Sequence, residues 1–407
     1  MSAPTLATTD APVLFEERRS CNGHRIGIAT LNAARTLNGL SLEMARLLDA
    51  RLRAWAADAG IAMVVLHGAG EKAFCAGGDL HGLYRSMRDY RAGGSRDIRD
   101  NAYASDFFAV EYRLDYRIHT YPKPVLCWGH GIVMGGGIGL MAGASHRVVT
   151  ERSKLAFPEI SIGLYPDVGG SWLLNRVPDR GGLFLALTGA PLNAGDAIHA
   201  GLADWALRED DREAVLAALI KLPWSHDAAT TRRQLSDLLA QHASAPGDGP
   251  LQRHRAAIAQ ACAHETLEPI AVAIMDIAQD DPWLETAKRT LAAGAPSSAR
   301  LAFELQRRAA SMPLADVFRL EYLVSLRCAA HGDFAEGIRA LLIDKDRQPH
   351  WRPATLAEAS QAWAEAFFSA PWPDSEHPLA DLGQDRTETD PMPKHPIQHD
   401  LIQGDHQ

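Results

Sequence analysis

Two glycine clusters in the sequence have the composition of loops that bring backbone N–H groups against a ligand. The first contains Gly77 and Gly78, the second contains Gly135, Gly136 and Gly137, and each comes after a predicted strand. Glycine lets a ligand approach the backbone closely, and unpaired N–H groups at the start of a helix favour negative charge. Two such donors that converge on one oxygen form an oxyanion hole. Taken alone, each cluster is also typical of a tight turn.

Two carboxylates downstream of the glycines could perform acid–base or nucleophilic chemistry. Glu159 follows Pro158, and Asp167 lies between Pro166 and a Gly-Gly pair. Prolines restrict the backbone and can hold a loop carboxylate in place. One carboxylate can then act as base or nucleophile while the other binds a substrate hydroxyl. Helix caps and turns are the structural alternative for both residues.

Other chemistries fit the sequence less well. Residues 137–142 match the GxGxxA fingerprint of dinucleotide-binding loops, with Glu159 about 20 residues further on. This fingerprint lies deep in the chain and leaves the first glycine cluster without a role, so we disfavour it. Ser161 lies in Glu-x-Ser-x-Gly instead of Gly-x-Ser-x-Gly, which disfavours an α/β-hydrolase mechanism. The histidines form no His-Glu-x-x-His motif, and we expect no metal site.

The composition narrows the classes of partner and compartment. The chain has 407 residues, 46% hydrophobic and 22% charged, with a net charge of −9. This profile is typical of a globular protein without a nucleic-acid or anionic membrane partner, and no apolar run reaches the roughly 18 residues of a membrane span. The five cysteines are scattered, and residues 1–12 fit neither a signal nor a transit peptide. We therefore predict a cytoplasmic location.

The elements that must position these residues alternate between strands and helices in the first half of the chain. Residues 81–100 carry five arginines and are expected either to form a solvated helix and loop or to meet a phosphorylated ligand. From about residue 181 the pattern is helical. Hydrophobic patterning predicts strands at 13–17, 24–31, 61–67, 125–133, 146–150 and 154–157, and helices at 40–57 and 101–119.

Together these motifs resemble the crotonase (enoyl-CoA hydratase/isomerase) superfamily and, within it, the 3-hydroxyisobutyryl-CoA hydrolase branch. The similarity covers roughly residues 12–356. The glycine clusters are shared across the superfamily, whereas the Pro-Asp-Val-Gly-Gly and Asp-Lys-Asp segments are specific to the hydrolase branch. The matching stretches are 74–79, 123–124, 131–139, 150–151, 158–159, 163–170, 187–189 and 336–346.

The resemblance implies an α/β protein with a crotonase-like core, the ββα superhelix of the ClpP/crotonase fold. We expect this core over residues 13–205 and a helical C-terminal region over residues 206–370. Residues 1–12 are expected to be disordered, and so is the tail at 371–407, which is rich in proline and acidic residues. Members of the superfamily are often trimers or hexamers, so a homo-oligomer is compatible with the resemblance.

The resemblance also implies a mechanism on an acyl-CoA substrate. The thioester carbonyl would lie between the backbone N–H groups of Gly78 and Gly136. Glu159 would attack it to give a mixed anhydride, or would activate a water molecule that does so, and these two routes stay open. Asp167 would bind the 3-hydroxyl of the substrate.

Three further residues are implied as substrate contacts. Glu111 falls where the family has a substrate-contacting glutamate on a helix, with a surface position as the alternative. Gly77 and Asp79 belong to the first glycine loop, along which the adenosine diphosphate end of CoA would lie. CoA is then part of the substrate, and we expect neither a metal nor a separate cofactor.

One departure from the hydratases decides the expected reaction. Hydratases carry two glutamates across the bound enoyl group, but here the first of these positions is Gly139 and only the second remains, as Glu159. The resemblance therefore implies an acyl-CoA thioester hydrolase for a short-chain 3-hydroxyacyl-CoA, with 3-hydroxyisobutyryl-CoA of valine degradation as the expected substrate. An enoyl-CoA hydratase or isomerase is the first alternative. A catalytically silent acyl-CoA-binding protein is the second.

Overall fold

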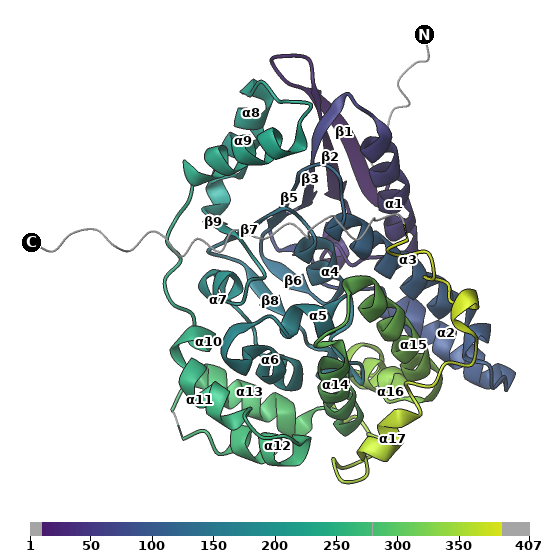
Figure 1. Cartoon of the computed structure of the whole chain (residues 1–407). Coiled ribbons are helices and arrows are strands. Elements are labelled where there is room, and N and C mark those ends of the chain that lie inside the picture. Colours follow the sequence, from purple (N-terminus) through teal and green to yellow (C-terminus); the bar gives the residue numbers. More distant parts are fainter. Residues whose placement is uncertain (1–9, 279, 385–407) are drawn as a thin grey trace, which may run out of the picture.

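Two β-sheets form the centre of the molecule. The computed structural model describes residues 10–278 and 280–384 of the chain (Figure 1). The strands are β1 (Val13–Arg19), β2 (Arg25–Leu31), β3 (Ile61–Gly68), β4 (Ala73–Cys75), β5 (Val125–Gly129), β6 (Ile132–Met134), β7 (His146–Thr150), β8 (Lys154–Ala156) and β9 (Trp205–Leu207).

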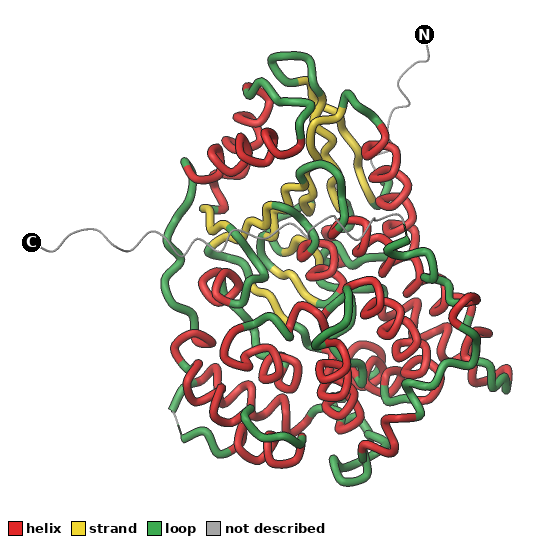
Figure 2. Tube along the Cα trace, in the orientation of Figure 1, coloured by secondary structure: helices red, strands yellow, loops and turns green. Residues whose placement is uncertain are grey.

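Helices surround the sheets and make up most of the second half of the chain (Figure 2). No helix of the described residues has the length and apolar character of a membrane span. The helices up to β9 are α1 (Leu42–Ala57), α2 (Leu80–Gly93), α3 (Ala102–His119), α4 (Gly136–Ala142), α5 (Gly170–Leu174), α6 (Gly181–Thr188) and α7 (Ala194–His199). Those after β9 are α8 (Arg212–Lys221), α9 (Ala228–Ala240), α10 (Pro250–Arg253), α11 (Arg255–Ala261), α12 (Leu267–Met275), α13 (Pro282–Ala293), α14 (Pro296–Ala309), α15 (Leu314–His331), α16 (Phe334–Ile338) and α17 (Gln361–Glu365).

The strand order describes a superhelix of repeated ββα turns. The larger sheet has the order β1-β2-β3-β5-β7-β9, and the smaller has the order β4-β6-β8. Each of the pairs β3 and β4, β5 and β6, and β7 and β8 places one strand in the larger sheet and the next in the smaller, before helical structure follows. All pairings are parallel except that of β1 with β2. The predicted α/β fold class with a helical C-terminal region is confirmed.

The single strand predicted over residues 125–133 is wrong in one respect, because it is two strands in different sheets. β5 pairs with β3 and β7, whereas β6 pairs with β4 and β8. The chain turns between them at Gly131, which has a φ of +57°. A Cβ at this position would overlap the carbonyl oxygen of Lys72, so only glycine allows the change of sheet.

The parallel strands of the larger sheet are buried on both faces, as expected for such strands, whereas β1 at the edge is mostly exposed or half-buried. Met63, Trp128 and Val148 project from one face and pack with Leu219 of α8 and Leu235 of α9, two helices that lie beside the strands at the upper left of Figure 1. The opposite face belongs to a second cluster of buried residues, which also includes side chains of α1, α3, α14 and α15. The strands therefore share this second cluster with the C-terminal helices α14 and α15.

Part of the tail that the sequence predicted to be disordered is packed against the C-terminal helices. Trp372, Leu379 and Leu382 are buried. Arg319 of α15 donates hydrogen bonds to the carbonyl groups of Leu379 and Leu382, and Arg113 of α3 forms an ion pair in the same segment. Residues 371–384 therefore differ from the prediction, because a few spaced apolar side chains anchor them. The rest of the predicted tail, residues 385–407, lies outside the described residues.

The predicted disordered N-terminus is also only partly described. Residues 1–9 lie outside the described residues. Residues 11 and 12 are tied to the end of β2, because the backbone N–H of Asn32 donates to the carbonyl of Pro12 and its side-chain amide donates to the carbonyl of Ala11.

The packing of residues 371–384 against the C-terminal helices can be tested directly. Leu379 has no exposed surface, so we expect Leu379→Ala to lower the free energy of unfolding by about 2–4 kcal/mol, as truncation of a buried leucine does. Leu341→Ala is the matched control, because Leu341 is 42% exposed and a change there is expected to stay within about 0.5 kcal/mol. Denaturant unfolding measures both. Equal, small effects would mean that the segment does not contribute to the folded core.

Candidate active site

Both glycine clusters and both predicted carboxylates meet around one pocket. They come from the loop after β4, the start of α4, the short 3-10 helix η3 (Glu159–Ile162) and the loop before α5. The lining residues are Ala76, Gly77, Gly78, Leu80, Leu83, Phe107, Phe108, Glu111, Met134, Gly135, Gly136, Pro158, Glu159, Ile162, Leu164, Asp167 and Phe334. Among them are all the predicted site residues except Asp79.

Asp79 lies outside the pocket lining because it caps a helix. Its Oδ1 accepts a hydrogen bond from the backbone N–H of Gly82 at 2.9 Å, which places Asp79 at the N-cap of α2. Its Oδ2 accepts from the Tyr103 hydroxyl at 3.0 Å. Both oxygens are thus occupied by the protein. Asp79 is therefore a helix cap in this structure.

The backbone N–H groups of Gly78 and Gly136 lie close together without a protein acceptor. Neither donates a hydrogen bond to any residue in 10–278 or 280–384. Gly136 is the first residue of α4, where N–H groups have no partner within the helix. A Cβ on Gly136 would lie 3.5 Å from the backbone N of Gly78 and would overlap Oε1 of Glu111. The missing side chain therefore lets both N–H groups and the Glu111 carboxyl share one small space.

Glu159 faces this space from the start of η3. Its side chain is buried, and its Oε2 has no hydrogen-bond partner in the described part of the chain. Burial, followed by the charge of Asp167, raises the pKa of Glu159 well above its usual value. An unpartnered carboxylate oxygen in an apolar pocket is chemically available to a ligand.

Asp167 is buried but, unlike Glu159, is held by the protein. Its Oδ2 accepts a hydrogen bond of 2.6 Å from the Tyr112 hydroxyl. The loop that carries it continues into Val168, which has a φ of +54°. Both oxygens of Glu321 on α15 accept backbone hydrogen bonds just beyond, from Gly169 at 2.7 Å and from Ser171 at 3.0 Å. Burial raises the pKa of Asp167 to about 6, and the hydrogen bond from Tyr112 opposes the shift.

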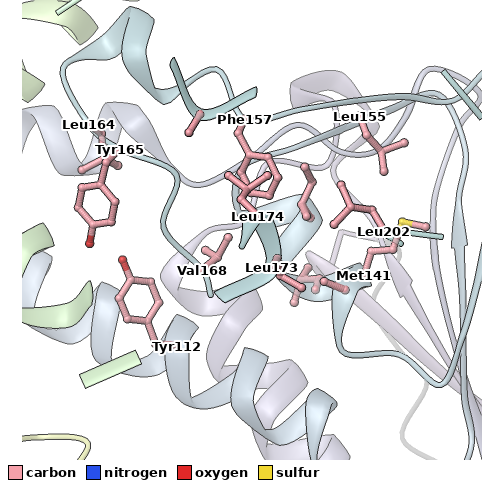
Figure 3. Packing of buried hydrophobic residues seen from close by; sticks show 14 of the residues in the cluster. Tyr112, Met141, Leu155, Phe157, Leu164, Tyr165, Val168, Leu173, Leu174 and Leu202 are labelled. Carbon is pink, nitrogen blue, oxygen red and sulfur yellow. The ribbon is translucent and has the colours of Figure 1, made fainter. Parts of the chain in front are cut away.

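A chain of hydroxyl groups extends from Asp167 into the C-terminal region. Tyr112 lies 2.7 Å from Ser325 of α15, Ser325 lies 2.8 Å from Tyr165, and Tyr165 donates at 2.6 Å to the carbonyl of Glu321. Figure 3 shows Tyr112 and Tyr165 with their hydroxyl groups pointing toward each other. We call Tyr112, Ser325 and Tyr165 the hydroxyl chain. All three residues are fully buried.

Two carboxyl groups of α3 complete the electrostatic environment. Glu111 lines the pocket. Asp115 lies one helical turn later on α3 and is buried without lining the pocket. Neither oxygen of Asp115 has a hydrogen-bond partner among the described residues. Burial is the main reason why the pKa of each carboxyl is raised well above its usual value, and the charge of Asp167 adds to the shift of Glu111. A Cβ on Gly139 would lie only 2.6 Å from Oδ2 of Asp115.

Several of these residues were missed by the sequence reasoning. Asp115 could have been found, since Glu111 and Asp115 are spaced to share one face of a helix. Tyr112, Ser325 and Glu321 carry no local signal, because an isolated hydroxyl or carboxylate on an amphipathic helix is usually a surface or packing residue.

The arginines of residues 81–100 do not line the pocket. Arg91 donates to the carbonyl of Gly332, Arg88 lies over the ring of Tyr84, and Arg99 pairs with Asp97. No group of three or more His, Cys, Asp or Glu side chains in 10–278 and 280–384 is arranged to hold a metal ion. The absence of a separate cofactor, the absence of nucleic-acid and membrane partners, and a homo-oligomer stay predictions.

The chain is similar to proteins that act on CoA esters. A family model described as enoyl-CoA hydratase/isomerase matches residues 26–368. A relative from Danio rerio named "3-hydroxyisobutyryl-CoA hydrolase, mitochondrial" is 37% identical over 351 residues, which cover 85% of this chain and 87% of that protein.

Two solved structures have the same fold over 89% of this chain and 98% of theirs. One is titled a carnitinyl-CoA dehydratase from Mycobacterium thermoresistibile, with 38% identity and a TM-score of 0.78. The other is titled an enoyl-CoA hydratase from Rhodobacter sphaeroides, with 35% identity and a TM-score of 0.76. The predicted crotonase-like core is confirmed by these neighbours.

The predicted cytoplasmic location is contradicted. The Danio rerio relative is named as a mitochondrial enzyme. Reduced, scattered cysteines therefore did not identify the compartment, because they are compatible with more than one reducing environment.

The raised pKa of Asp167 predicts how a variant should respond to pH. A carboxyl with a folded-state pKa near 6 and an unfolded-state pKa near 4 stabilises the fold below about pH 4, and this contribution is lost as the pH rises through 6. Asparagine does not titrate. We therefore expect Asp167→Asn to gain about 2–3 kcal/mol of unfolding free energy relative to the unchanged chain between pH 4 and pH 7.

Denaturant unfolding at several pH values measures this difference. Asp381→Asn is the control, because the hydrogen bond from Arg113 lowers the pKa of Asp381. Its stabilising contribution is lost only below about pH 4, so we expect its difference from the unchanged chain to stay nearly constant between pH 4 and pH 7. A difference between Asp167→Asn and the unchanged chain that does not vary with pH would show that Asp167 titrates normally.

Proposed function

The chain belongs to the enoyl-CoA hydratase/isomerase family, and we propose that it hydrolyses a short-chain 3-hydroxyacyl-CoA thioester. The names of the relatives favour 3-hydroxyisobutyryl-CoA as the substrate. Its hydrolysis would yield 3-hydroxyisobutyrate and free CoA in valine degradation. The observation that carries the proposal is the meeting of one unpartnered glutamate oxygen with two unpaired N–H donors in a single pocket.

In this proposal Gly78 and Gly136 form the oxyanion hole. Their N–H groups would hold the thioester oxygen and stabilise the negative charge that develops on it. One such donor typically contributes about 2.7–4 kcal/mol to the transition state. The position of Gly136 at the start of α4 supports this role, since the helix dipole adds to the attraction for an oxyanion.

Glu159 acts on the thioester carbon, either as the nucleophile or as the base for a water molecule. Its free Oε2 and its burial support both routes. Asp167 binds the 3-hydroxyl through its Oδ1, because its Oδ2 is engaged with Tyr112. Glu111 lies beside the oxyanion hole, and this position supports a role for it as a contact of the acyl group.

The surroundings of Gly139 support hydrolysis over hydration. A hydratase pair would need a second glutamate at this position, but a Cβ there would lie 2.6 Å from Oδ2 of Asp115 and 2.8 Å from Cβ of Val168. There is thus no room for a longer side chain unless the neighbours move. Without a second carboxylate at position 139, Glu159 beside the oxyanion hole suits acyl transfer to water.

Hydration of an enoyl-CoA is the second candidate. The titles of the two solved structures favour it, since they name a dehydratase and a hydratase. The two reactions differ in one product, because only hydrolysis releases free CoA thiol.

Glu159→Gln tests the catalytic glutamate. We expect the rate of thiol release from 3-hydroxyisobutyryl-CoA to fall by about 10²–10⁴-fold, with binding of the CoA ester retained in calorimetry. Glu43→Gln, at an exposed position of α1, is the matched control and should behave as the unchanged enzyme. Turnover of Glu159→Gln at the unchanged rate would remove Glu159 from the mechanism.

A substrate panel tests Asp167 and the reaction class together. With 3-hydroxyisobutyryl-CoA, 3-hydroxypropionyl-CoA, isobutyryl-CoA and crotonyl-CoA, we expect thiol release mainly from the two hydroxylated esters. Asp167→Asn should reduce kcat/KM for these esters more than for isobutyryl-CoA, because it alters the group that binds the hydroxyl. Equal losses would assign Asp167 a general structural role. Loss of the crotonyl double bond without thiol release would identify a hydratase instead.

A further inference from the structure

The hydroxyl chain has more contacts than it has protons when Asp167 is ionised. Four contacts of 2.6–2.8 Å run in series from Asp167 through Tyr112, Ser325 and Tyr165 to the carbonyl of Glu321. Each contact needs one proton to be a hydrogen bond. The three hydroxyl groups supply only three protons, so one pair of oxygens would face each other with none between them.

Protonation of Asp167 supplies the missing proton. Asp167 then donates to Tyr112, Tyr112 donates to Ser325, and Ser325 donates to Tyr165. The carbonyl of Glu321 can only accept, so the proton of Tyr165 points to it in both states. With a neutral Asp167, each of the four contacts is therefore a complete hydrogen bond.

We propose that Ser325 and Tyr165 are positioning residues that hold Asp167 in its neutral, proton-donating form by completing this hydrogen-bond chain. Both residues are fully buried, so solvent does not compensate for an unmatched pair of oxygens. Ser325 lies on the C-terminal helix α15, and Tyr165 lies on the same loop as Asp167. Neither residue lines the pocket, so both act through Tyr112.

The groups around Asp167 favour the same state. Burial raises its pKa to about 6 before the proton count of the chain is considered. None of the described titratable groups that face it is basic, so no cation favours its ionised form. These groups are Glu111, Tyr112 and Asp115 of α3, Glu159 of η3, Tyr165 of the same loop, and Glu321 and Cys328 of α15.

A neutral Asp167 has a consequence for Glu159, which rests on the proposed function. After burial, the charge of Asp167 is the largest cause that raises the pKa of Glu159. Removing that charge makes Glu159 easier to ionise, and only the ionised carboxylate can attack the thioester or accept a proton. The hydroxyl chain would thus keep the hydroxyl-binding carboxyl neutral so that the catalytic one can be charged.

The test measures the pKa of Asp167 directly in the full-length chain without substrate. Infrared difference spectra recorded across a pH series report protonated carboxyl groups, and the band that is lost in Asp167→Asn identifies Asp167. We expect Ser325→Ala and, independently, Tyr165→Phe to lower this pKa by about half a unit to one unit, because each removes the mismatch that disfavours the ionised form. We expect Tyr112→Phe to raise it, because that change removes the donor to the ionised form.

Ser105→Ala is the matched control. Ser105 makes a hydroxyl contact of 2.8 Å with Tyr322 between the same two helices, α3 and α15, but this contact does not lead to Asp167. It should leave the pKa of Asp167 unchanged. Shifts of the same sign in Tyr112→Phe and Ser325→Ala, or no shift in both Ser325→Ala and Tyr165→Phe, would overturn the proposal.

The pH dependence of thiol release adds a second, separable readout. In Ser325→Ala we expect the acid limb of kcat/KM to move to higher pH, because a more ionised Asp167 raises the pKa of Glu159. If no CoA ester is hydrolysed, the proposed function fails, and the infrared titration still decides the state of Asp167.

Discussion

The burial of several carboxyl groups in one apolar region is the constraint on which the rest of this structure depends. Glu111, Asp115, Glu159, Asp167 and Glu321 are all buried, and burial is the main reason why each has a raised pKa. The described residues that line the pocket include neither Lys nor Arg. Because this apolar region cannot hold five negative charges, some of the five carboxyl groups must be protonated while others are ionised. Which of them are ionised depends on which receive hydrogen bonds from the protein. Different pKa values among neighbouring carboxyl groups are what give them different roles in one site.

The helical C-terminal region takes part in this distribution and is therefore part of the site. Glu321 of α15 fastens the loop after Asp167, and Phe334 of α16 lines the pocket. Val168 has a left-handed backbone conformation that a β-branched residue adopts only where its surroundings require it. The two backbone hydrogen bonds to Glu321 supply that requirement. A core without α15 would therefore lose the position of Asp167 as well as packing area.

The sequence predicted the parts of this molecule that depend on local signals. Glu159 and Asp167 stand beside prolines or glycines in short motifs that marked them as candidates, and the family resemblance of these motifs implied that they share one site. Ser325 and Tyr112 meet across 213 residues of sequence, and no local pattern distinguishes a serine that joins a hydrogen-bond chain from one that packs on a helix. The stretch 125–133 did carry a signal of two strands, because Gly129, His130 and Gly131 interrupt its apolar residues, but the prediction treated it as a single strand.

The close approach of Asp115 to Gly139 limits how this active site can change in evolution. A side chain at position 139 would meet Oδ2 of Asp115 at once, so a glutamate could enter only after position 115 had lost its carboxyl or moved it. A change between reaction types that need one or two carboxylates here therefore involves position 115 as well as position 139. Among homologues, positions 115 and 139 should accordingly vary together, with bulk at one accompanied by a smaller residue at the other.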